Sequence, residues 1–119
     1  MDADPHNETS INPAIRRSLA IFGLTGGIAN QDMSREEFIE TMEYSEELIQ
    51  PLRDLTPNGG VYREESSFNE PNWEWANYGE NYAALKEIKQ KYDPFRMFRV
   101  WNGIGGTRPE TGTEHQYDL

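Results

Sequence analysis

The spacing of apolar residues predicts two helices, and the first begins after Ser34. Ser34 and Glu37 form a capping box, in which each side chain satisfies an amide that the first helical turn leaves unpaired. Pro51 falls within the apolar series, and proline lacks the amide proton of a helix interior, so we expect this helix to end or kink near Gln50. The apolar face consists of Phe38, Met42, Ser45, Ile49 and Leu52.

The second predicted helix lies in the aromatic-rich half of the chain. Its apolar residues also recur at the spacing of one helical face. They are Tyr78, Tyr82, Leu85, Ile88 and Tyr92. Asp93 and Pro94 follow, and proline disfavours helical geometry in the residue before it. We therefore expect the helix to end at this dipeptide.

Three shorter segments are candidates for strands. Residues 61–64 follow the turn signal of Gly59 and Gly60, and residues 95–101 are apolar at some alternate positions. The third is Ile15 with the apolar run 19–24, which Gly26 and Gly27 would end. The pattern over residues 13–22 also fits a single helix, so both interpretations stay open for this segment.

Composition limits the chain to one domain with a modest core. It has 119 residues, of which 35% are hydrophobic, and aromatic side chains supply much of what can be buried. Acidic residues number 21 against 11 basic ones, which gives a net charge of −10. This field repels phosphate, so nucleic acids and anionic membranes are disfavoured as partners.

Several chemistries are excluded by what the sequence does not contain. Without cysteine there are no disulfides and no thiolate metal sites, and His6 and His115 lie in separate polar ends, so we expect no metal site. No apolar run approaches the roughly 20 residues of a membrane span, and the first residues do not form a secretory signal. A complete chain of this kind would be cytoplasmic.

An ordered series of motifs between residues 12 and 105 resembles a known family. The family is the berberine bridge enzymes, FAD-linked oxidases with a vanillyl-alcohol-oxidase type of flavin fold, and the likeness is to the C-terminal part of its fungal members. The motifs are Asn12 and Pro13; Gly59, Gly60, Tyr62, Glu64 and Glu65; Tyr78, Gly79, Asn81 and Tyr82; and Leu85, Lys89, Asp93, Pro94 and Phe98.

The resemblance implies a fold and a division of the chain. It favours a strand within residues 15–24, and so an α+β fold with a short antiparallel sheet of about three strands and the two main helices packed on it. This domain would occupy residues 11–106, between flexible arms at residues 1–10 and 107–119. The interpretation requires that residues 62–65 are extended and lie beside the aromatic helix.

The resemblance also implies site residues, FAD as cofactor and a small-molecule substrate. Glu65 matches the position of a catalytic base, and Tyr62 would face the substrate beside it. Asn81 matches an asparagine that helps to hold the flavin, and Tyr78 is a second candidate for cofactor contact, although it could also pack in the core. Enclosure of Glu65 in an apolar cavity with Tyr62, Trp73 and Trp75 would raise its pKa.

Two departures from the family weaken the implied cofactor site. Glu64 stands where the family usually has asparagine, and no Gly-rich phosphate loop follows a strand. We therefore expect that this chain alone does not hold FAD tightly. In an intact relative, the substrate would lose a hydride to the flavin while a base such as Glu65 takes a proton.

Three interpretations follow from these observations. The chain is the substrate-side part of an FAD-dependent oxidoreductase without its flavin domain, which would then be its partner. Alternatively, it is a flavin-free isomerase or cyclase that uses Glu65 as acid or base. In the third, it is a non-catalytic module that forms a homodimer through an apolar face.

Overall fold

The computed structural model describes residues 9–24 and 32–106, and these residues form only helices and irregular segments. No strand occurs in these ranges, so the predicted three-stranded sheet and α+β class are wrong. Most of the predicted N-terminal arm, residues 1–10, and all of the predicted C-terminal arm, residues 107–119, lie outside the described residues. In order, the elements are α1 (Pro13–Arg17), α2 (Arg35–Leu55), the 3-10 helix η1 (Arg63–Glu65), α3 (Trp73–Tyr78), the 3-10 helix η2 (Gly79–Asn81) and α4 (Tyr82–Tyr92).

The first predicted strand is replaced by α1. Asn12 caps this helix, because its side-chain oxygen accepts the N–H of Ala14 at 2.9 Å, and Pro13 occupies the first helical position, where a missing amide proton costs nothing. The helix ends at Arg17, and residues 19–24 are irregular and exposed. Gly26 and Gly27, the expected end of the strand, lie outside the described residues.

The second predicted strand is the 3-10 helix η1. The N–H of Glu65 donates to the carbonyl of Tyr62 at 2.9 Å, which closes the turn. Val61 donates its N–H to the carbonyl of Ala76 at 2.8 Å, so the segment is bonded to α3 and not to a neighbouring strand. The requirement that residues 62–65 be extended is therefore not met. The segment lies beside α3, of which only Tyr78 belongs to the predicted aromatic helix.

The third predicted strand fails because the side chain of Asp93 bonds to the backbone that would form it. Its carboxylate accepts the N–H groups of Met97 (2.8 Å) and Phe98 (3.1 Å), and amides used in this way cannot join a ladder. Arg96 also has a φ of 51°, which lies outside the extended region. Residues 95–101 therefore form a folded loop.

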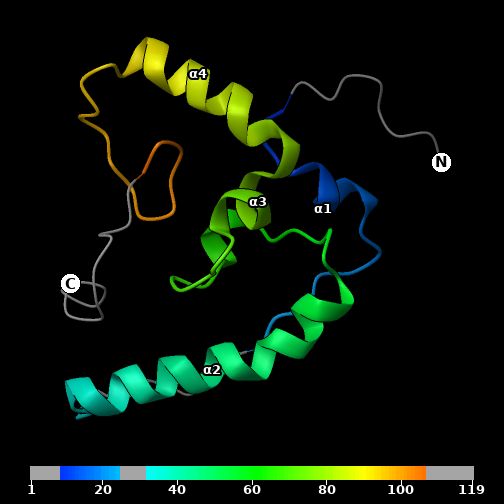
Figure 1. The fold of residues 1–119 in the computed structure, drawn as a ribbon, viewed down its shortest axis with the longest axis vertical. Coiled ribbons are helices and arrows are strands. Elements are labelled where there is room, and N and C mark those ends of the chain that lie inside the picture. The colour runs from blue at the N-terminus through cyan, green and yellow to red at the C-terminus, as the bar shows by residue number, and fades with distance from the viewer. Residues whose placement is uncertain (1–8, 25–31, 107–119) are drawn as a thin grey trace.

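The predicted start of α2 is confirmed, and of the two outcomes predicted at Pro51, an end or a kink, the structure shows the kink (Figure 1). The Ser34 and Glu37 capping box is present, with Glu37 accepting the N–H of Ser34 at 2.8 Å and Ser34 accepting that of Glu37 at 3.2 Å. The helix does not end at Gln50 but continues through Pro51 to Leu55. In Figure 1 its C-terminal part turns away from the line of the first part, as a proline in a helix causes.

The aromatic series forms two helices instead of one. Tyr78 ends α3, and Gly79 follows with a φ of 56°, a conformation that glycine adopts without strain. The remaining members of the series lie on α4, which ends at Tyr92 with Asp93 as its C-cap, so the predicted end is confirmed. Gly79, with its positive φ, thus divides the helix, although the apolar residues on both sides of it keep the spacing of one helical face in the sequence.

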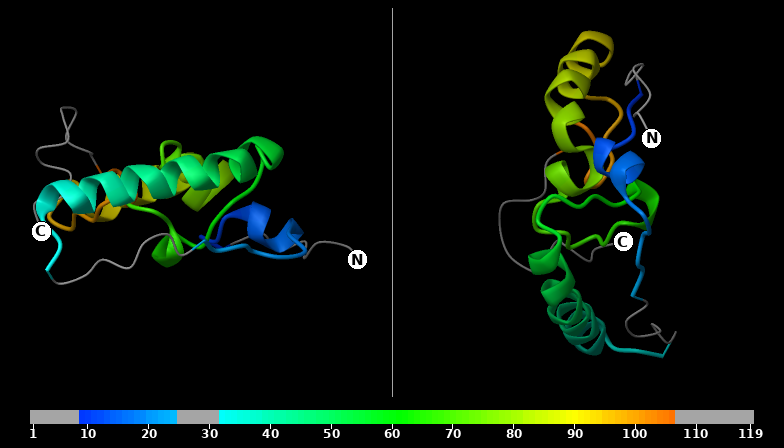
Figure 2. Two further views of the ribbon diagram at one scale, coloured as in Figure 1. Left: turned by 90° about the horizontal axis from the view of Figure 1, so that it is seen from below. Right: turned by 90° about the vertical axis from the view of Figure 1, so that its right-hand side faces the viewer.

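The core of the described residues is small and lies where α1, α3 and η2 meet. Ala14 and Tyr78 are its buried apolar residues. The buried polar residues of the described ranges are Asn12, Asn77, Asp93 and Asn102, of which Asp93 lies at the C-terminal end of α4. α2 contributes no buried residue. It lies at one end of the molecule and α4 at the other, with α1 and α3 between them (Figure 1; Figure 2, right).

Candidate functional site

Asn12 is the most buried residue at the centre of the fold, with 2% of its surface exposed. Its side-chain nitrogen donates to the carbonyls of Trp75 (2.9 Å) and Ala76 (2.8 Å), and its oxygen caps α1. One amide group thus satisfies two carbonyls of α3 and one N–H of α1. Asn12 therefore joins α1 to α3, through bonds to residues that lie 63 and 64 positions further along the chain.

Two motif glycines allow the backbone to approach Asn12. A methyl group added at Gly60 would lie 2.5 Å from the side-chain nitrogen of Asn12, and one added at Gly79 would lie 2.6 Å from its oxygen. Both distances are too short for any larger residue to fit without movement. Asn12, Gly60 and Gly79, which belong to three separate motifs of the sequence, therefore meet at one point.

Asn81, a predicted cofactor contact, bonds to the segment that leads into Asn12. Its side-chain nitrogen donates to the carbonyls of Thr9 (3.0 Å) and Ile11 (2.9 Å). Both protons of the amide nitrogen are therefore used within the chain. In this arrangement Asn81 holds residues 9–11 against η2.

Tyr78, the second predicted cofactor contact, is buried in a cluster of aromatic rings. Its ring centroid lies 6.5 Å from that of Trp73 and 5.7 Å from that of Tyr82. Its hydroxyl donates to the carbonyl of Asn102 at 3.1 Å, and burial raises its pKa against the opposing influence of Arg63. Tyr78 thus anchors the C-terminal segment to α3.

Tyr82 completes the aromatic cluster at the start of α4. Its ring packs edge-on against Trp73, with centroids 5.6 Å apart. Burial, followed by a hydrogen bond with Glu74, raises the pKa of Tyr82 to about 12. Its hydroxyl is therefore neutral across the physiological range.

The predicted catalytic residues, Tyr62 and Glu65, lie at the two ends of the turn that forms η1. Tyr62 precedes the helix with extended backbone geometry, and Glu65 is the last residue of the helix. Both side chains are exposed, Tyr62 at 48%. Glu65 is therefore not enclosed in the apolar cavity that the sequence suggested.

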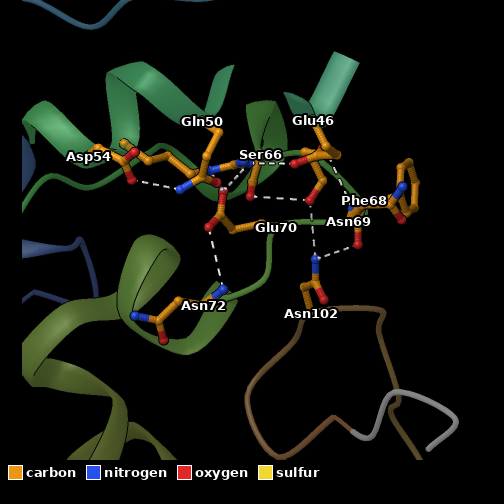
Figure 3. Close-up of polar contacts among 11 residues, drawn as sticks. Glu46, Gln50, Asp54, Ser66, Phe68, Asn69, Glu70, Asn72 and Asn102 are labelled. Atoms are coloured by element: carbon orange, nitrogen blue, oxygen red, sulfur yellow. Dashed lines mark hydrogen bonds and ion pairs between the residues drawn. The ribbon is translucent and has the colours of Figure 1, made fainter. Parts of the chain in front are cut away.

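A polar network joins α2 to the rest of the molecule (Figure 3). Arg53 bonds Glu46 of its own helix at 2.6 Å and Glu70 of the following loop at 2.8 Å. Burial alone lowers the pKa of Arg53, but the two carboxylates outweigh it and the net pKa is raised. Ser67 donates to Glu46, and the Asn102 amide donates to the carbonyl of Ser67 at 3.3 Å, which extends the network to the C-terminal segment.

The four candidate residues do not line either of two depressions that follow α2. The first is lined by Glu46, Glu47, Gln50, Pro51 and Asp54, and the second by Asp32, Met33, Glu37, Glu40 and Thr41. Within the described ranges, no three His, Cys, Asp or Glu side chains could hold a metal ion. The helices of the described part include none with the length and apolar character needed to cross a membrane.

Sequence reasoning noted Asn12 only as part of a motif and did not identify its structural role. The signal was present, because Asn followed by Pro is the usual start of a helix, with a capping residue and proline at the first helical position. Arg53 and Asp93 were also missed as organising residues. Their partners lie in other elements, and no local pattern indicates them.

Comparison with known proteins places this geometry within a larger fold. Residues 61–105 match the family model described as berberine and berberine like. The VAO-type flavoprotein oxidase VAO615 of Thermothelomyces thermophilus is 38% identical over 102 residues, which are 85% of this chain and 18% of that protein. The FAD-linked oxidoreductase sor8 of Hypocrea jecorina is 33% identical over 104 residues, again 18% of its length.

A solved structure matches the fold as well as the sequence. It is the VAO-type flavoprotein MtVAO615 from Myceliophthora thermophila C1, with a TM-score of 0.57 and 40% identity over 66% of this chain and 15% of that one. The chain therefore spans less than a fifth of the length of these relatives. About two thirds of this chain thus has a fold that also occurs inside a much longer protein.

Proposed function

The chain belongs to the berberine and berberine-like family, and from this premise we propose that it is the substrate-side part of an FAD-linked oxidoreductase. The observation that carries the proposal is the match of 85% of this chain to 18% of a fungal flavoprotein oxidase. A small-molecule substrate would lie between this part and the remainder of the protein. The remainder would bind FAD.

The described residues themselves do not fit the role of holding FAD. The two predicted cofactor contacts use their polar atoms inside the chain, Asn81 on Thr9 and Ile11, and Tyr78 on Asn102. We therefore assign them an indirect role, in which they fix the shape of the surface that faces the cofactor. The binding of the FAD itself belongs to the rest of the oxidase.

Glu65 is our candidate for the proton acceptor, and Tyr62 for its neighbour at the substrate. The exposure of both side chains, at the two ends of the η1 turn, supports this proposal, because both are open to a molecule that binds there. The carboxylate can take a proton from the substrate and later return it to water. Glu64 lies next along the chain, where Arg63 pairs with it at 3.2 Å.

The test is Glu65→Gln in the full-length oxidase, with Glu64→Gln as the matched control. We expect kcat to fall by about 10²–10⁴ for Glu65→Gln, the usual contribution of a positioned acid or base, and to change little for the control. The visible spectrum of bound flavin should be the same in both. Unchanged turnover by Glu65→Gln would remove the assigned role, and turnover by the 119-residue chain without FAD would favour a flavin-free enzyme.

A further inference from the structure

Arg63 is the one residue of η1 that is not exposed, and it lies between the two candidate residues, Tyr62 and Glu65. Its side chain is 30% exposed, whereas that of its neighbour Glu64 is 57% exposed. A charged side chain that is mostly covered by protein needs partners for its donor groups. The main partners of Arg63 lie in other parts of the fold.

The first of these partners is the carbonyl of Trp101, 38 residues further along the chain. One terminal nitrogen of the guanidinium donates to this carbonyl at 3.2 Å, and the other pairs with Glu64 at 3.2 Å. A guanidinium directs several donors from one rigid plane, so a single arginine can serve both acceptors. The pair with Glu64 contributes little because that carboxylate is exposed, so the bond to Trp101 is the one that fixes Arg63.

The Trp101 carbonyl belongs to a turn that is itself held in place. Gly103 donates its N–H to the carbonyl of Val100 at 2.9 Å, which closes the turn around Trp101 and Asn102. The ring N–H of Trp101 donates to the carbonyl of Phe68 at 2.8 Å, and the side-chain amide of Asn102 donates to the same carbonyl at 3.3 Å. Arg63 is therefore bonded to a fixed acceptor.

The aromatic cluster is the second neighbour of the guanidinium. Burial raises the pKa of the Tyr78 hydroxyl, and the positive charge of nearby Arg63 opposes this rise. The same hydroxyl donates to the carbonyl of Asn102 at 3.1 Å, in the turn that Arg63 also contacts. The guanidinium thus lies where η1, α3 and the C-terminal turn meet.

Two bonds from different residues locate the segment that carries the candidate site. Val61 donates its N–H to the carbonyl of Ala76 at 2.8 Å and holds the backbone just before Tyr62. Arg63 holds the η1 turn itself, through its bond to Trp101. The position of the guanidinium therefore determines where the side chains on either side of it project.

We propose that Arg63 is a positioning residue, which holds η1 so that Glu65 and Tyr62 are directed to the substrate. The proposal rests on the function proposed above, in which Glu65 takes a proton. Arg63 acts through Glu65 and not by contact with the substrate, because its own donors are directed to Trp101 and Glu64. A catalytic group displaced by about 1 Å can lose about a hundredfold in rate, so the bond that fixes η1 matters for turnover.

The test is a double-mutant cycle in the full-length oxidase, with Arg63→Ala, Glu65→Gln and the two together. We expect kcat to fall by about 10–10²-fold for Arg63→Ala with little change in KM, and Arg63→Lys, which keeps one charged donor, to regain part of the loss. The double variant should be as active as Glu65→Gln alone, to within about twofold, because residues that act as a unit are not additive. Arg17→Ala, exposed at the end of α1, is the control and should keep the parent kcat.

Amide hydrogen exchange of the same variants reports on η1 without turnover. The N–H of Glu65, bonded to the carbonyl of Tyr62 at 2.9 Å, should exchange about tenfold faster in Arg63→Ala. The N–H of Met97, which Asp93 holds at 2.8 Å, should exchange as in the parent and show that the rest of the fold is intact. If Arg63→Ala does not fold, Arg63→Met keeps the apolar stem without the donors and gives the same comparison.

The possible outcomes separate this proposal from the proposed function. Full activity in Arg63→Ala would overturn the positioning role alone, provided that Glu65→Gln is impaired, as would losses that multiply in the double variant. Unchanged exchange at Glu65 would also overturn it, because η1 would then keep its shape without Arg63. Full activity in Glu65→Gln would refute the assigned base and with it this role. A full-length protein without oxidase activity would refute the proposed function, and exchange at Glu65 would then decide whether Arg63 fixes η1.

Discussion

At the scale of single residues, short polar side chains connect the described segments. Asn12 bonds α1 to α3, Asn81 bonds η2 to residues 9–11, and Asp93 shapes the loop after α4. Each of these side chains bonds backbone groups of a helix end or of an irregular segment, which have few partners of their own. The two catalytic candidates, Tyr62 and Glu65, are exposed instead, so their side chains are open to a substrate.

Asn12→Ala tests whether this polar connection holds the fold. We expect the free energy of unfolding to fall by about 2 kcal/mol, because the N–H of Ala14 loses its acceptor and the carbonyls of Trp75 and Ala76 each lose one of two donors. Urea unfolding followed by circular dichroism measures the change. Gln90→Ala, on the exposed side of α4, should stay within about 0.5 kcal/mol, and an equally small effect for Asn12→Ala would contradict the structural role.

At the scale of elements, the sequence predicted the helices better than the connections between them. The capping box and the Asp93 helix end are local signals, and both are confirmed. The strand predictions were wrong because they rested on short apolar runs. Such a run does not distinguish a strand from a helical turn or from a loop that side chains hold in place. What decides between them is a distant partner, such as Ala76 for Val61, and a local pattern does not contain it.

The bend in α2 gives an element-scale prediction. Pro51 removes one hydrogen bond from the helix interior, so Pro51→Ala should straighten α2 and raise the free energy of unfolding by about 2 kcal/mol, with a stronger helical signal in circular dichroism. Pro57→Ala is the matched control. Pro57 lies in the turn that Gly59 closes onto Thr56 at 2.8 Å, where proline is favourable, so its loss should cost stability.

A loss of stability in Pro51→Ala would mean that the bend itself is needed. Arg53 follows the bend and reaches Glu70 only if the last turn of α2 is directed toward the loop. In that case the loss of the ion pair would outweigh the gained helix bond.

At the scale of the whole molecule, the described residues resemble part of a larger body. Their buried apolar core consists of Ala14 and Tyr78, while side chains as large as Phe22, Leu55 and Phe95 are more than three-quarters exposed. Asn77 is buried with no partner for either polar atom of its side chain, which is costly unless another group completes the bonds. The ordered motifs predicted the family correctly, and members of two separate motifs, Asn12 and Gly79, lie in contact in this structure.

The last prediction concerns FAD and the 119-residue chain on its own. We expect no flavin to remain with the chain after mixing and gel filtration, because Asn81 and Tyr78 use their donor groups within the chain and both depressions on the described surface are lined by acidic side chains, which repel a pyrophosphate. The full-length oxidase, treated in the same way, should keep its visible flavin band. One FAD co-eluting with each 119-residue chain would show that this segment holds the cofactor itself, and the division between a substrate-side part and a cofactor-binding remainder would then be wrong.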